Sequence, residues 1–157
     1  MSRPPVEAVL QAGDTETLYR RAGDGPPVLL LCTGVLADPL GGRLFERLAT
    51  RARVIAPACP AGSRATDILA DWLAEVSEGL GLERPSVVID EGLASALLDG
   101  ELAASERFAS VIVAVAGGSD ASERAADLAR RGAHVVPVVD DDASAVAAAV
   151  LLLLGER

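Results

Sequence analysis

Acidic side chains that could transfer protons stand directly after two apolar runs of the sequence. Asp90 and Glu91 follow residues 87–89, and Asp140 follows residues 135–139. A carboxylate held in an apolar pocket can act as a general acid or base toward a small organic molecule. Burial and neighbouring acids favour its protonated form, whereas the N-terminus of a helix favours its charged form. Asp90 is therefore either a proton-transfer group or the N-cap of the helix expected to follow it.

Thiol and hydroxyl side chains follow two further apolar runs. Cys32 and Thr33 come after residues 28–31, and Cys59 comes after residues 54–56. A cysteine nucleophile needs a base, and none is identifiable, so each cysteine is interpreted as a small apolar side chain that can face a pocket. The cysteines lack metal-ligand spacing and form no disulfide framework. The acidic run 140–142 is typical of a helix-capping turn rather than a metal site, so we expect no metal. We expect no cofactor either.

The apolar runs alternate with segments of helical periodicity, which predicts a doubly wound, mostly parallel α/β sheet. The expected strands cover residues 6–10, 17–20, 28–31, 54–56, 87–90, 111–115 and 135–139. The expected helices cover residues 40–50, 66–80, 92–104, 119–131 and 143–154. The pattern of Asp120 and Glu123 predicts a capping box for the fourth. In such a fold the site lies at the carboxyl ends of the strands, which is where the polar residues named above stand.

Composition narrows the class of protein. The 157 residues fit one domain, 1–157, in which half of the residues are hydrophobic and only 3% are aromatic. The net charge of −9 repels phosphate backbones and anionic lipid, and the scarcity of rings argues against base stacking, so we expect neither nucleic acid nor a membrane as a partner. No signal peptide is visible, and the longest apolar stretch, 145–154, is well short of the roughly 20 residues of a membrane span. A cytoplasmic protein is expected.

The order of these segments resembles the α/β-hydrolase family. Residues 22–31 (AGDGPPVLLL) are similar to the family's approach to its oxyanion loop, and residues 33–35 would occupy that loop with threonine in place of histidine. Residues 54–63 resemble the segment after the family's fourth strand, residues 82–92 its nucleophile elbow, and residues 106–113 the strand after it. The resemblance covers residues 6–115 and implies a three-layer doubly wound fold.

The resemblance also assigns roles to individual residues. If Gly92 is the second glycine of the elbow, Asp90 stands at the nucleophile position, where the family's epoxide hydrolases and haloalkane dehalogenases use aspartate. The backbone N–H groups of Val35 and Glu91 would then form the oxyanion hole. Asp140 would stand where the family keeps its triad acid.

Two parts of the family's machinery have no counterpart in the sequence. The family takes its catalytic histidine from after an eighth strand, and the sequence ends before that strand could form. The only histidine, His134, precedes the last expected strand, and we place it a strand length of about 20 Å from the site. The lid is reduced to the helix 119–131. We therefore expect a shortened fold that lacks the lid and the eighth strand and does not carry out Ser-His-Asp hydrolysis.

The last expected helix, 143–154, is apolar on every side, which predicts complete burial. A second subunit is the simplest cover, so we expect a homodimer through this helix. Pro137 lies in the strand 135–139 that precedes this helix. Because proline cannot donate a backbone hydrogen bond, it indicates that this strand is at the edge of the sheet.

Three functions remain open at this point. The first is an acid–base enzyme of the isomerase, lyase or cyclase type that acts on a small organic molecule through Asp90. The second is a non-catalytic pseudo-hydrolase that binds a small molecule or a partner, which the missing lid favours. The third is residual ester or epoxide hydrolysis. The residues expected to form the site are Asp90, Glu91 and Asp140 for catalysis, and Thr33, Gly34, Val35, Gly92, Cys32 and Cys59 for binding.

Overall fold

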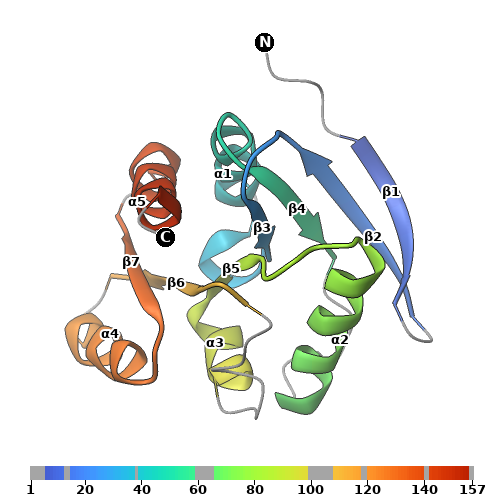
Figure 1. Ribbon diagram of the computed structural model, residues 1–157. Coiled ribbons are helices and arrows are strands. Elements are labelled where there is room, and N and C mark those ends of the chain that lie inside the picture. Colours follow the sequence, from blue (N-terminus) through green and yellow to red (C-terminus); the bar gives the residue numbers. More distant parts are fainter. Residues whose placement is uncertain are drawn as a thin grey trace.

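A computed structural model describes residues 6–12, 15–37, 39–58, 66–98, 108–117, 120–139 and 142–155. Within these residues one seven-stranded sheet has the order β1-β2-β4-β3-β5-β6-β7 (Figure 1). The strands are β1 (Val6–Ala12), β2 (Thr15–Ala22), β3 (Pro27–Leu30), β4 (Arg53–Pro57), β5 (Ser86–Asp90), β6 (Val111–Ala116) and β7 (His134–Val138). β2 is antiparallel to both β1 and β4, and the pairs from β4 to β7 are parallel.

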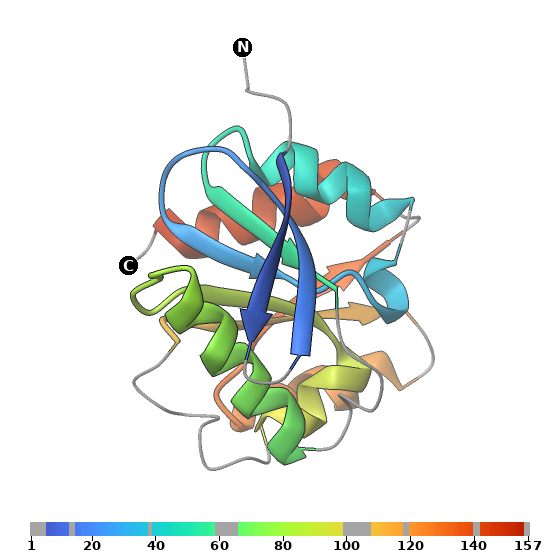
Figure 2. The same cartoon turned by 90° about the vertical axis from the view of Figure 1, so that its right-hand side faces the viewer.

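Helices cover both faces of the sheet, so the molecule has three layers (Figures 1 and 2). The helices are η1 (Gly34–Leu36, a 3-10 turn), α1 (Leu40–Leu48), α2 (Thr66–Gly79), α3 (Glu91–Leu98), α4 (Ala121–Arg130) and α5 (Ala143–Gly155). One core forms between the sheet and α1 with α5, and the other between the sheet and α2, α3 and α4. The expected three-layer, doubly wound and mostly parallel fold is confirmed.

The central strands form where the sequence is continuously apolar. Every residue of β5 is buried, as are the last three of β3 and the first five of β6. Strands buried on both faces need apolar side chains at successive positions rather than in alternation, which is the pattern seen here. The hairpin β1–β2 lies at one edge of the sheet and exposes Val9 and Leu18, which pair across the two strands. No helix within the described ranges is long and apolar enough to cross a bilayer.

The inner side of α5, which includes Val146 and Val150, packs on the sheet, whereas Leu152 is 66% exposed. The cover of this exposed side by a second subunit stays a prediction. One expectation about the helices is wrong. The capping box at the start of α4 does not form, because the Asp120 side chain makes no capping hydrogen bond and instead pairs with Arg124. A carboxylate at the start of a helix can accept a hydrogen bond from a backbone N–H or pair with a nearby guanidinium. The Asp120 carboxylate pairs with the guanidinium of Arg124.

Candidate functional site

Asp90 lies at the junction of β5 and α3, which follow each other without an intervening residue. Its side chain is 5% exposed. The Leu93 backbone N–H donates a hydrogen bond to Asp90 Oδ1 over 3.2 Å, three residues along the chain. This is the geometry of a helix N-cap, in which a side-chain oxygen satisfies a backbone donor of the first turn. The carboxylate therefore has a structural task at the start of α3.

The loop after β3 supplies the other neighbours of Asp90. Because β3 and β5 are adjacent in the sheet, their carboxyl ends lie side by side. The Thr33 hydroxyl donates a hydrogen bond to Asp90 Oδ1 over 3.1 Å. Gly34 has φ of +56°, and a Cβ atom there would overlap Asp90 Oδ2. The structure thus brings together Thr33, Gly34 and Asp90, as the order of segments predicted, and covers both oxygens of the carboxylate with the loop.

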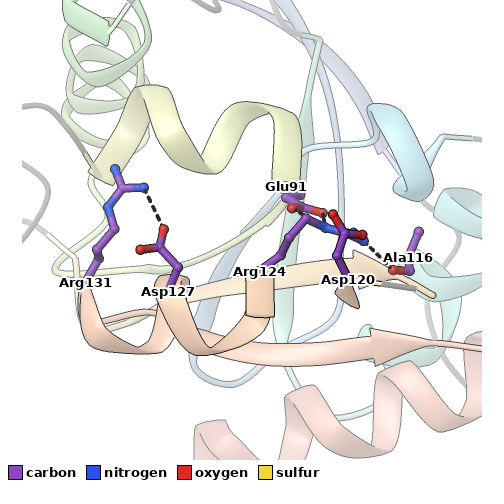
Figure 3. A network of polar contacts seen from close by, with 6 residues as sticks. All are labelled: Glu91, Ala116, Asp120, Arg124, Asp127 and Arg131. Carbon is purple, nitrogen blue, oxygen red and sulfur yellow. Dashed lines mark hydrogen bonds and ion pairs between the residues drawn. The ribbon is translucent and has the colours of Figure 1, made fainter. Parts of the chain in front are cut away.

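Glu91 belongs to a different set of contacts, which is shown in Figure 3. Its carboxylate forms an ion pair with Arg124 of α4, with Arg124 Nε 2.8 Å from Glu91 Oε2. The same guanidinium pairs with Asp120 and donates a hydrogen bond to the Ala116 carbonyl oxygen over 3.0 Å. Arg124 thereby joins the ends of β6, α3 and α4, and Glu91 acts within that network rather than beside Asp90.

Sequence reasoning did not identify Arg124 as part of this region. Its spacing of four residues from Asp120 is a typical helical ion-pair spacing and was a usable signal. The pair with Glu91 spans 33 residues and depends on how α3 and α4 pack, for which the sequence carries no local signal.

The remaining expected binding residues lie around the loop after β3 and the start of α3. Val35 is half-buried in η1, which packs against β5 and β6. Gly92 is the exposed second residue of α3. Cys32 is half-buried beside Gly41 of α1, where a Cβ atom on the glycine would come within 3.0 Å of Cys32 Sγ. Two expected site residues, Cys59 and Asp140, lie outside the described residues.

His134 is the exposed first residue of β7. The register places Asp90 level with Ala114, and Ala114 level with Val136, so His134 is two residues and two strands away from Asp90. A rise of about 3.3 Å per residue and a strand spacing of about 4.8 Å put the two backbones roughly 12 Å apart. The expected separation of about 20 Å was too long, but the imidazole is still outside hydrogen-bond reach of Asp90.

A cavity of about 340 Å³ lies at the ends of β3 and β4, against the β1–β2 hairpin. Thr33 and Cys32 form one wall of this cavity. The rest of the lining comes from the hairpin and the end of β4, namely Glu7, Leu18, Tyr19, Arg20, Ala56, Pro57 and Ala58. Asp90 does not line the cavity, and its hydrogen-bond donor Thr33 does. The hairpin residues were not expected at the site, because a strand at the sheet edge carries no signal for pocket formation.

Known structures share the arrangement of these elements. A serine hydrolase involved in carbazole degradation matches 74% of this chain with a TM-score of 0.58 and 26% identity, over 50% of its own length. The carboxylesterase CesB from Bacillus subtilis matches 82% of this chain with a TM-score of 0.59 and 20% identity, over 52% of its own length. The chain therefore spans about half the length of these two enzymes.

A shorter protein matches over nearly its full length. A predicted CIB-like hydrolase from Thermoplasma acidophilum matches 98% of this chain and 99% of its own, with a TM-score of 0.75 and 10% identity. At this identity the likeness concerns the fold alone. Neither a protein-family model nor a curated protein sequence matches the chain.

Proposed function

Since the chain has a shortened α/β-hydrolase fold, we propose that it is a lidless pseudo-hydrolase that binds a small organic molecule in the cavity beside Thr33. The observation that carries the proposal is the position of the Asp90 carboxylate. A group that exchanges a proton with a ligand must come within hydrogen-bond reach of it. Asp90 is buried, caps α3 and does not line the cavity, whereas Thr33, which donates a hydrogen bond to it, does.

A catalytic conformation of Asp90 would carry a structural cost. Turning the carboxylate toward the cavity breaks the bond from the Leu93 N–H, and the loss of a helix N-cap costs about 1 kcal/mol. It also disturbs the contact of Oδ2 with Gly34. These costs favour a carboxylate that stays in place while a ligand occupies the cavity.

Hydrolysis through a covalent intermediate receives less support. An ester on Asp90 needs a base that directs water at it, and the base must lie within hydrogen-bond reach. The one histidine of the sequence, His134, is exposed and roughly 12 Å away by the strand register. The neighbouring acid Glu91 is engaged by Arg124.

One observation favours an acid–base enzyme as a second candidate. The Thr33 hydroxyl borders the cavity and donates to Asp90 Oδ1. In such an enzyme Thr33 Oγ1 would take a proton from the ligand and pass its own proton to Asp90. The backbone of the loop 33–35 would stabilise the developing negative charge on the ligand. This is chemistry of the isomerase, lyase or cyclase type.

Ligand-observed NMR with a library of small organic molecules tests the binding proposal. Compounds that bind the wild type should bind Asp90→Asn with affinity within about twofold, because the side-chain oxygen of asparagine can still cap α3. Ala58→Trp should abolish binding by filling the cavity, whereas Ala145→Trp on the exposed side of α5 serves as the control. Unchanged binding to Ala58→Trp, or no binding by the wild type, refutes the proposal. A turnover that Asp90→Asn abolishes without loss of binding establishes the second candidate instead.

A further inference from the structure

Arg20 places a cationic group at the cavity. In the register of the sheet Arg20 lies between Glu7 of β1 and Ala56 of β4, so its side chain leaves the sheet on the side of α1. The guanidinium carbon lies 5.0 Å from the centre of the Phe45 ring. Phe45 is fully buried in the core under α1, so its ring is a fixed platform. A cation–π contact of this kind holds the guanidinium in place without neutralising its charge.

The charge of Arg20 has no carboxylate partner among the described residues. The ion pairs found there involve Arg124, Arg130 and Arg131. Glu7 borders the same cavity and lies directly across the hairpin from Arg20, yet the two side chains form no ion pair. An arginine that is positioned by a ring and unpaired at a cavity wall is suited to bind an anion, because its planar fork matches a carboxylate through two parallel hydrogen bonds.

The rest of the cavity is suited to an apolar body. Leu18, Ala56 and Pro57 contribute apolar wall, and the Leu18 side chain is 63% exposed. A volume of about 340 Å³ lies at the small end of the range for small-molecule sites. From these features we infer that the ligand is a small organic carboxylate, whose carboxylate binds Arg20 and whose apolar part covers Leu18. This inference rests on the proposed binding function and names its ligand class.

The negative charge of the protein opposes binding of the ligand's carboxylate. The chain carries a net charge of −9, which disfavours the approach of any anion, so affinity for one requires a local cationic contact. Glu7 offers the opposite preference, since a cationic ligand could pair with it. Glu7 is exposed and Arg20 is half-buried. Because a less solvated charge interacts more strongly, we expect an anionic ligand to bind more tightly than a cationic one.

Calorimetric titration with three probes that share one alkyl chain tests the inference: hexanoate, hexan-1-ol and hexylamine. Hexanoate should bind about tenfold or more tightly than hexan-1-ol, as expected for a hydrogen-bonded charge pair. Arg20→Gln should remove this preference, and Arg20→Lys should retain part of it. Arg21→Gln is the matched control, because Arg21 is the next residue of β2 on the opposite side of the sheet and is exposed.

Each outcome has a distinct meaning. Equal binding of hexan-1-ol and hexanoate, or tighter binding of hexylamine, overturns the carboxylate class while the binding function stands. A preference for hexanoate that persists in folded Arg20→Gln, checked by circular dichroism, overturns the role of Arg20. If none of the three probes binds, the inference fails, and the library screen with Ala58→Trp decides separately whether the cavity binds ligands at all.

Discussion

Gly34→Ala should destabilise the protein through a specific conflict with Asp90. Gly34 has φ of +56°, in the left-handed region that disfavours residues with a Cβ atom. A Cβ atom at this position would also overlap Asp90 Oδ2. Because the carboxylate is buried and holds the cap of α3, it cannot move aside without losing its hydrogen bonds. The substitution therefore combines local backbone strain with the disruption of the Asp90 contacts.

The two contributions can be estimated separately. The left-handed conformation costs a residue with a Cβ atom about 1–2 kcal/mol. Displacing the carboxylate breaks the hydrogen bonds from Thr33 and Leu93, and the loss of two bonds to a charged group adds about 3–6 kcal/mol. The total of about 4–8 kcal/mol corresponds to a fall in melting temperature of about 8 °C or more for a domain of this size.

Denaturant unfolding of a double-mutant cycle measures the conflict. In the background Asp90→Ala, Gly34→Ala should cost only the backbone strain, so the two substitutions should be coupled by about 2 kcal/mol or more. Gly81→Ala is the matched control, because Gly81 has φ of +66° and a Cβ atom there would meet no other group within 4 Å. If Gly34→Ala costs no more than Gly81→Ala, or if the cycle is additive, the Asp90 carboxylate does not lie against Gly34.

Three further predictions concern other parts of the molecule. Arg124→Ala should lower the free energy of unfolding by about 1–2 kcal/mol, because it removes three contacts. Arg130→Ala removes one exposed ion pair and should cost less than about 0.5 kcal/mol. Equal effects of the two substitutions would contradict the bridging role of Arg124. Light scattering should find that the wild type is a homodimer. Leu152→Lys should convert the dimer to a monomer and Val139→Lys should leave it intact, since both side chains are similarly exposed but only Leu152 lies on α5. A monomeric wild type refutes the predicted homodimer. His134→Gln should leave stability and ligand binding unchanged, and a loss of binding in that variant would contradict its position on β7.

The main elements follow from patterns that are local in the sequence. The apolar run 87–90 predicted β5, which begins one residue earlier, and the periodicity of residues 40–50 predicted α1, which ends at Leu48. The antiparallel pairing of β2 with β4, such as Tyr19 opposite Pro57, joins distant segments. Composition and periodicity carry no signal for that pairing, so the order of the strands was not predicted.

The neighbours of Asp90 in the candidate site could be predicted from the sequence, but the direction of its side chain could not. The segment order placed Thr33 and Gly34 next to Asp90, and the structure brings them together. The direction of the carboxylate was not predictable, because capping and catalysis require the same residue type at the same position. The ion pair of Glu91 with Arg124 was missed, since it depends on the distance between two helices rather than on spacing along one.

The geometry of the junction itself accounts for an acid at position 90. β5 ends at Asp90 and α3 begins at the next residue, so the last strand residue is the only one that can cap the helix. Aspartate is among the best residues for this task, and the first-turn N–H of Leu93 would otherwise be buried without a partner. Stability alone is thus a sufficient reason for the carboxylate. Serine, which also caps helices well, should lose only the hydrogen bond from Thr33, whereas leucine should lose the cap of α3 as well and destabilise the protein more. This contrast holds whether or not the cavity binds a ligand.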